Sequence, residues 1–412
     1  MFVYDMTDDE FAAVFGKAQV LSEVFREIGP KHDEENTFAH STVAPFKESR
    51  LGAVQVPKRY GGLGGDLLTT SKIVTELSRG DSAITLAYNM HYIMVGIAGS
   101  LMTEEQSKYW LGRVADGDLM FGPFSEQRAG FSGLADMKAV PQPGGGWRLY
   151  GKKTWGTLAE AADIITTNAT ITDADGNLPE DFQARVNAES LFIGEFTVDE
   201  NGQGDGIRIE KTWNALGMHA TGTQTIHFEG YYVPQEGFLS EWRTGAFGVL
   251  EWASLMFASI YYGMQLRILE EARAVLSKKT LGATFGAIVA EDTRVARIGH
   301  IVDGIGDFAS RAELSRRVLY QTINDVMSGY DDEWPLTLRF PYIGLAKTFI
   351  ADNVMHMSRH AMSMVGGSSF RKGTIFERLY RDSAASMFQP LNADQSRTYI
   401  GEQLLAPDRP EE

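Results

Sequence analysis

The chain has 412 residues, 43% of them hydrophobic, and this length exceeds what one hydrophobic core usually accommodates, so we expect two or three cooperating domains. A formal net charge of −16, with basic residues that cluster no further than pairs such as Lys278-Lys279, argues against a nucleic-acid-binding protein. The lack of cysteine excludes disulfides, thiolate nucleophiles and thiolate metal sites.

The N-terminal part of the chain has a helical pattern. Its start, residues 1–10, is acidic and lacks both the basic leader and the apolar segment of a signal peptide, which predicts a cytoplasmic protein. The spacing Thr7-x-x-Glu10 predicts a capping box, and apolar residues recur every three to four positions over residues 67–78 and 104–114. We expect an N-terminal α-helical domain over residues 1–120.

Two apolar stretches, residues 84–102 and 250–266, resemble membrane spans in length. Each is interrupted by polar residues, such as His91 in the first and Gln265 in the second, and neither provides about 20 uninterrupted apolar residues. We therefore expect buried core helices and no membrane association.

The sequence pattern changes at residue 121, where glycine and proline begin to cluster between short apolar runs. Runs such as 147–150, 164–167, 191–198 and 225–229 predict antiparallel strands, and the polar segment 172–188 predicts an exposed loop.

This region, residues 121–236, is the expected middle β-domain. From residue 237 to residue 412 long helical periods return, notably over 250–276, 292–327 and 341–365, and they predict a C-terminal helical bundle. The predicted fold class is α+β, with two helical domains around the β-domain.

Six short motifs follow one another along the chain. In order, they are Pro57-Lys-Arg-Tyr-Gly-Gly-Leu-Gly64, Gly151-Lys-Lys-Thr-Trp-Gly-Thr157, Trp213-Asn-Ala-Leu-Gly-Met218, Tyr232-Val-Pro234, Val365-Gly-Gly367 and Glu377-Arg-Leu-Tyr-Arg-Asp382. Each is a weak pattern by itself, but in this order and at these separations the chain resembles the acyl-CoA dehydrogenase superfamily of flavoproteins from Pro57 to Leu405. The resemblance implies a three-domain subunit with a β-barrel-like middle domain, and FAD bound between the subunits of a homodimer or homotetramer.

The resemblance also implies which residues bind the cofactor. A flavin needs a flat apolar slot for its ring and a few hydrogen-bond donors beside it. The residues matched to cofactor contacts are Phe124, Ser125, Gly130, Trp155, Thr157, Lys278, Gly366, Gly367, Asn392 and Asp394. Lys278 stands where the family has an arginine, which keeps the charge but loses the two-pronged hydrogen bonding, so FMN or reduced flavin stays an alternative to FAD.

The resemblance fails at the catalytic base. Dehydrogenation of an acyl thioester needs a carboxylate that removes the α-proton, and the family's glutamate position falls on Pro390. A second family position for the base falls on Ala253. Glu251, two residues earlier, is the predicted catalytic residue if the helix register shifts; the alternative is an acid near a helix N-terminus.

The predicted substrate-binding residues surround these positions. They are Phe131, Ser132, Glu251 and Ser254, and Phe131 replaces a family serine that helps to hold the cofactor and acyl-CoA. His356 and His360 lie four residues apart on a predicted helix, but no third ligand is near in sequence, so we expect a helix-face pair and no metal.

Three functions stay open. The first is dehydrogenation of an acyl thioester of CoA or a carrier protein, with a relocated base and an electron-transfer flavoprotein as partner. The second is a monooxygenase that uses reduced flavin from a flavin reductase, a reaction that needs no carboxylate opposite the flavin. The third is a non-catalytic member of the fold, which predicts that no flavin is retained.

Overall fold

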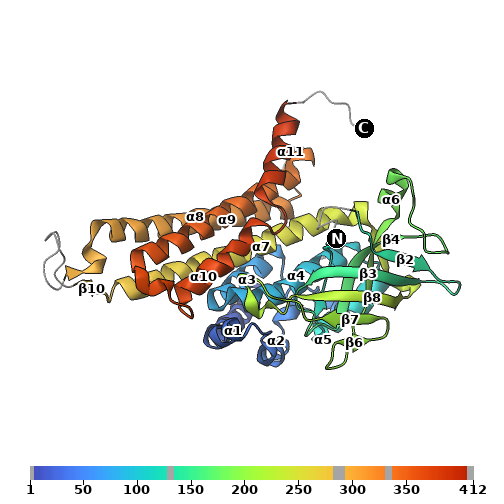
Figure 1. Cartoon of the computed structure of the whole chain (residues 1–412), viewed down its shortest axis with the longest axis horizontal. Helices are drawn as coiled ribbons and strands as arrows, with labels where there is room; N and C mark the ends of the chain where they lie inside the picture. Colours follow the sequence, from blue (N-terminus) through green and yellow to red (C-terminus); the bar gives the residue numbers. More distant parts are fainter. Residues whose placement is uncertain (1–3, 128–133, 282–292, 330–335, 406–412) are drawn as a thin grey trace.

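The computed structural model describes residues 4–127, 134–281, 293–329 and 336–405. Figure 1 shows the β-sheet at one end of the molecule and the long C-terminal helices at the other, with the N-terminal helices packed against the region between them. The α+β architecture predicted from the sequence, two helical parts around a β-domain, is therefore confirmed.

The N-terminal part is built from helices that begin at polar caps. They are α1 (Asp8–Glu35), α2 (Val43–Ser49), α3 (Leu67–Gly80), α4 (Ser82–Leu101) and α5 (Glu104–Asp116). The predicted capping box is present, because the Thr7 side chain accepts from the backbone N–H of Glu10 and the Glu10 side chain accepts in return. Helices α3 and α5 confirm the periodic segments 67–78 and 104–114.

The middle part is a nine-stranded sheet in the order β6-β7-β8-β3-β2-β4-β5-β9, with β1 paired to β4. The strands are β1 (Met120–Phe121), β2 (Lys138–Pro141), β3 (Trp147–Gly156), β4 (Ile164–Ile171), β5 (Glu189–Glu195), β6 (Gln203–Gly204), β7 (Ile207–Glu210), β8 (Gln224–Val233) and β9 (Phe238–Glu241). Most neighbours are antiparallel as predicted, but β4 runs parallel to both β1 and β2. Strand β9 pairs with β5, so the sheet extends a few residues beyond the boundary predicted at residue 236.

The segment 172–188 was predicted to be a loop throughout, and its last part is helical. Helix α6 (Phe182–Ala188) begins after Asp181, whose side chain accepts from the N–H of Ala184 at 2.8 Å. None of the residues of α6 is buried. An exposed helix of this length leaves no apolar periodicity in the sequence, which is why the pattern did not indicate it.

The C-terminal part is a bundle of long helices. They are α7 (Trp242–Leu276), α8 (Gly299–Met327), α9 (Leu336–Val365), α10 (Ile375–Ser383) and α11 (Ala393–Leu405), with a short hairpin of β10 (Thr280–Leu281) and β11 (Thr293–Arg294) after α7. Helix α7 packs against α3, α4, α8 and α9 and so joins the two helical parts.

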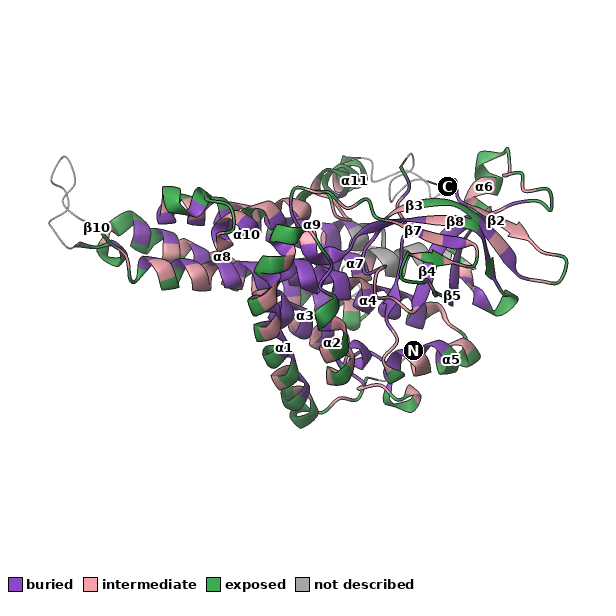
Figure 2. Cartoon of the chain, turned by 60° about the horizontal axis from the view of Figure 1, so that its bottom comes forward, coloured by how far each residue is buried: buried purple, intermediate pink, exposed green. Residues whose placement is uncertain are grey.

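The core of the molecule lies along α3, α4 and α7, where Figure 2 shows mainly buried residues. Helix α4 is the apolar stretch 84–102 of the sequence, and it is buried among protein neighbours. No helix in the described ranges is both long enough and apolar enough to cross a membrane.

Candidate functional site

A cavity of about 790 Å³ opens where the three parts of the chain meet. Its wall is formed by α4, the segment after β1, strand β3, the loop 213–218, helix α7 and the segment 384–390. Four of the predicted ring-binding residues, Phe124, Ser125, Trp155 and Thr157, line this one cavity. A second cavity of about 1160 Å³ lies between α5 and the strands β5, β7 and β8, and none of the predicted site residues lines it.

Trp155 reaches the cavity because β3 is bulged at this point. Lys153 pairs with Ile226 and Gly156 pairs with Gln224, so two residues of β3 oppose one residue of β8. A bulge of this kind turns a side chain out of the sheet. Trp155 adopts a left-handed backbone conformation with φ of 62°, and its side chain is 48% exposed. Such strain in a non-glycine residue is typical of functional sites.

Aromatic rings surround Trp155. The Trp213 ring lies 5.4 Å from it in an edge-on arrangement, and the Phe388 ring lies 5.8 Å away. These three rings come from the β-domain, the loop after β7 and the C-terminal part. They form an apolar, flat-sided wall of the kind that suits a planar ring system.

The polar groups beside this wall are held by short hydrogen bonds. The Ser125 carbonyl accepts from the backbone N–H of Thr154 at 2.8 Å, and the Thr157 hydroxyl is 2.8 Å from the Thr223 hydroxyl. Together they orient one edge of the cavity. Contact of these residues with a flavin stays a prediction, and Gly130, Phe131 and Ser132 lie outside the described residues.

A buried lysine, which sequence reasoning missed, supports the segment 124–126. Lys153 is fully buried, and its Nζ donates to the Phe124 carbonyl at 3.0 Å, the Glu126 carboxylate at 2.6 Å and Asn168 Oδ1 at 2.8 Å. Burial lowers the pKa of Lys153, opposed by the Glu126 carboxylate. The sequence offered one signal for this residue: Lys153 lies just beyond the predicted strand run 147–150. A lysine that is buried in a sheet needs a partner for its charge.

The acid in the cavity wall is fully engaged. Among the described residues that line the cavity, Glu126 is the one carboxylate. Besides the Lys153 ammonium, it accepts from the backbone N–H groups of Asp136 at 2.8 Å and Met137 at 3.3 Å. Because these donors occupy its carboxyl oxygens, Glu126 has a structural role and is not positioned to remove a proton from a substrate.

Helix α7 presents Ala253 and Phe257 to the cavity, four residues apart on one face. Glu251 precedes Ala253 by two residues, which places it about 200° around the helix from that face. Glu251 is not among the residues that line the cavity. Its role as a base therefore stays a prediction that the geometry of the cavity does not support.

The segment around Pro390 also lines the cavity, and side chains of α7 and α9 hold its backbone and side chains in place. Lys347, on α9, donates from Nζ to the carbonyls of Ser386 at 2.7 Å and Gln389 at 2.6 Å. Burial lowers the pKa of Lys347 to about 8. The Tyr261 hydroxyl donates to Gln389 Oε1.

Ser254 also holds this segment. Its hydroxyl accepts from the backbone N–H of Leu391 at 3.1 Å, and it is completely buried. Ser254 was predicted to bind substrate; within the structure it fixes the backbone of the segment that carries Pro390, and Pro390 itself lines the cavity.

The residues predicted for the phosphate end of the cofactor lie elsewhere. Lys279 donates from Nζ to the Val365 carbonyl at 2.6 Å, so the exposed Lys278 is brought to the neighbourhood of Gly366 and Gly367. Gly366 has a φ of 86°, and a Cβ on Gly367 would meet nothing within 4 Å. None of these residues lines the cavity around Trp155, so a single chain does not bring the two halves of the predicted cofactor site together.

Asn392 and Asp394 occupy the start of α11. The Asn392 side chain accepts from the N–H of Gln395 at 2.9 Å, as a helix cap does, and Asp394 is exposed in the first turn. Neither residue lines the cavity.

The motif Glu377-Arg-Leu-Tyr-Arg-Asp382 joins all three parts of the chain. Arg381 pairs with Asp33 of α1 at 2.6 Å, and Arg378 pairs with Asp81 at 3.0 Å. The carboxylate of Asp382 accepts from the Met218 N–H at 2.5 Å, and burial raises the pKa of Asp382 to about 7. The motif therefore holds the domains that frame the cavity.

A family model of the acyl-CoA dehydrogenase N-terminal domain matches residues 17–118. The chain is 24% identical over 397 residues to the "Probable acyl-CoA dehydrogenase FadE25" of Mycobacterium tuberculosis, and the match covers 92% of each protein. Butyryl-CoA dehydrogenase from Megasphaera elsdenii has the same fold, with a TM-score of 0.81 at 19% identity over 98% of this chain and 99% of that one. FMN-bound TdsC from Paenibacillus sp. A11-2, a dibenzothiophene monooxygenase, has a TM-score of 0.82 at 17% identity over 96% and 98%. The shared fold and the similarity along nearly the whole sequence show that this chain is an acyl-CoA dehydrogenase-like oxidoreductase.

Proposed function

We propose that the chain binds a flavin against Trp155 and that it oxygenates an apolar substrate in the adjoining cavity, using reduced flavin and O₂. The observation that carries this proposal is the chemistry of the cavity wall. Pro390 and Ala253, the two positions where the resemblance implies a catalytic base, both line the cavity, and neither can accept a proton. A reaction that needs no side-chain base opposite the flavin fits this wall.

The described residues fit a flavin ring. Trp155, Trp213 and Phe388 offer the flat apolar surface, and Ser125 and Thr157 lie at its edge. A bound flavin would supply the electron transfer and the reaction with O₂. The surrounding residues exclude water and orient the substrate, because most residues of the cavity wall are apolar.

We further propose that the full cofactor site needs a second copy of the chain. Lys278, Gly366 and Gly367 would contact the phosphates of FAD bound in the cavity of a partner copy, in a homodimer or homotetramer. Their separation from the cavity in a single chain supports this arrangement. FMN, which the structural neighbour TdsC holds, has no adenine half and would leave these residues without a ligand.

The second candidate is dehydrogenation of an acyl thioester, with an electron-transfer flavoprotein as acceptor. The similarity to acyl-CoA dehydrogenases along the sequence favours it. It requires a base from outside the described cavity wall, and Glu251 is the candidate that we retain from the sequence. The redox partner distinguishes the two candidate functions. Oxygenation receives electrons from a flavin reductase, whereas dehydrogenation passes electrons on to an electron-transfer flavoprotein.

Anaerobic titration of the purified flavoprotein with acyl-CoAs of several chain lengths tests the proposal. We expect the flavin absorption band at about 450 nm to persist with every thioester, because the described residues of the cavity wall offer no free base for α-proton removal. In the same preparation, a flavin reductase, NAD(P)H and isotopically labelled O₂ should transfer label into an apolar aromatic probe such as indole. Bleaching by a thioester would establish dehydrogenation instead. A colourless protein that does not take up FAD or FMN would point to a non-catalytic member of the fold.

A further inference from the structure

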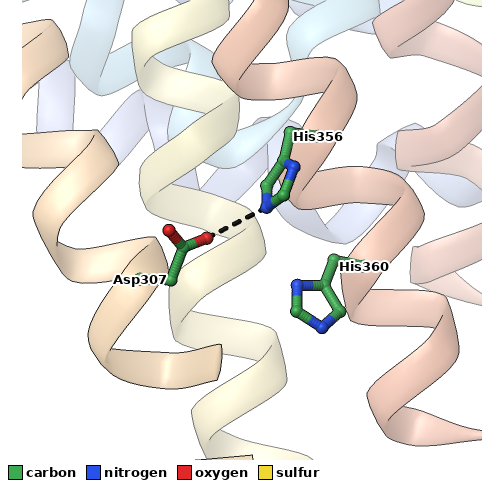
Figure 3. A group of neighbouring side chains, drawn as sticks. All are labelled: Asp307, His356 and His360. Atoms are coloured by element: carbon green, nitrogen blue, oxygen red, sulfur yellow. Dashed lines mark hydrogen bonds and ion pairs between the residues drawn. The ribbon is translucent and has the colours of Figure 1, made fainter. Parts of the chain in front are cut away.

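We propose that Asp307, His356 and His360 form a binding site for a divalent transition metal, best suited to zinc, which links α8 to α9. The three side chains converge from two helices, Asp307 from α8 and both histidines from α9 (Figure 3). One ligand atom of each lies within 4.8 Å of the other two. The sequence predicted no metal because no third ligand was near the histidines, and the third ligand comes from 49 residues away.

The geometry is close to that of a coordinated ion. His356 Nε2 and Asp307 Oδ2 are hydrogen-bonded at 3.0 Å, so the two atoms already lie about as close together as neighbouring ligands of one metal. Ligand atoms around tetrahedral zinc lie roughly 3.3 Å apart, given metal–ligand bonds of about 2.0–2.1 Å. A rotation of the His360 ring, which lies edge-on to the His356 ring with centroids 5.5 Å apart, closes the remaining gap.

The second observation is an unpaired nitrogen. His360 Nδ1 is buried and has no hydrogen-bond partner among the described residues. Burying an imidazole nitrogen without a hydrogen-bond partner costs free energy. Coordination of a metal ion by that nitrogen removes this cost, and histidine is a common metal ligand. The Phe308 ring packs edge-on against His360 at 5.8 Å and limits how far its ring can turn away.

The groups behind the ligands support coordination. Arg311 Nε bonds both oxygens of Asp307, at 3.0 Å and 2.8 Å, and Arg311 is itself held by Asn353 Oδ1 at 3.0 Å. Ligating carboxylates usually have such outer partners, which fix their orientation. Coordination through Oδ2 leaves Oδ1 bonded to Arg311. The guanidinium charge opposes the metal, so we expect moderate affinity.

The donor set decides the class of ion. Two imidazoles and one carboxylate suit zinc and neighbouring transition metals, and they are a poor set for calcium or magnesium, which prefer oxygen ligands. Solvent reaches the site, because the side chains of His356 and Asp307 are 30% and 34% exposed. None of the three ligands lines the cavity around Trp155, so the ion would stabilise the helix pair and take no part in the oxidation chemistry.

Zinc titration of the chelator-treated full-length protein, followed by calorimetry, tests the site. We expect one equivalent to bind with micromolar affinity, and a hundredfold excess over Kd to raise Tm by about 3 °C for a chain of this size. His356→Ala and His360→Ala should each weaken binding at least about 100-fold. His300→Ala, an exposed histidine elsewhere on α8, should leave it unchanged.

Asp307→Asn separates a three-ligand site from a simple histidine pair. It should weaken zinc binding, and affinity equal to that of the wild type would overturn the proposal. So would the absence of a bound equivalent in the wild type, or binding that survives in the double histidine variant. If a variant fails to fold by circular dichroism, the difference spectrum of the cobalt-loaded wild type decides: visible d–d bands of a low-coordinate N/O site support the proposal, and their absence overturns it.

Discussion

Asp382 gives the sharpest prediction about stability. Its carboxyl group is 2% exposed, and burial raises its pKa from 3.8 to about 7, although the N–H of Met218 opposes the shift. The folded state therefore prefers the protonated form. The stabilisation is complete below the unfolded pKa and is lost as pH rises through the folded pKa. Between pH 5.5 and pH 8.5 these two pKa values give a loss of about 2 kcal/mol.

Asp382→Asn removes this dependence while keeping an oxygen to accept from Met218. The free energy of unfolding of the wild type, relative to the variant, should fall by about 2 kcal/mol from pH 5.5 to pH 8.5, or about 2 °C in Tm. Denaturant unfolding followed by tryptophan fluorescence, at matched pH, measures it. Asp352→Asn, at a carboxyl group that is 71% exposed, is the control and should show no such trend. A difference between wild type and Asp382→Asn that is flat across this range would refute the reasoning.

Three further predictions concern the cavity. Lys347→Met leaves the carbonyls of Ser386 and Gln389 without a donor and should lower stability by about 1–3 kcal/mol, whereas Lys31→Met on the surface should change it by less than about 0.5 kcal/mol in the same unfolding assay. Trp155→Ala should weaken flavin binding at least about tenfold, and Trp155→Phe should weaken it much less, as measured by fluorescence titration. If Trp155→Ala binds flavin as tightly as the wild type, Trp155 does not contact the flavin ring. Glu251→Gln should change turnover less than about twofold; a loss of 100-fold or more would identify it as the base.

Several features of the fold were predictable because they depend on neighbours in sequence. The capping box at Thr7 and the helices α3 and α5 follow from local spacing, and they were confirmed. The strand runs were found for the same reason. The helix α6 was missed because it buries nothing, so its residues carry no apolar pattern.

The candidate site was predictable only in part. The motif around Trp155 indicated the residues of the wall, and the structure brings four of them together. Lys153 and Lys347 were not indicated, because what matters about them is which backbone carbonyls they meet after folding. Glu251 was predicted as the base because it is the acid two residues before Ala253 on the same helix. Ala253 lines the cavity, and Glu251 is on the other side of that helix.

The sequence by itself determined the periodicities, the caps and the order of the domains, since these depend on residues within a few positions of one another. Tertiary structure alone decided which groups from distant segments share a space. Asp307 contacts His356 across 49 residues of sequence, Arg381 contacts Asp33 across 348, and Pro390 and Trp155 line one cavity. Contacts of this kind depend on how α7 and the sheet pack, and packing is set by the whole core and not by any local pattern.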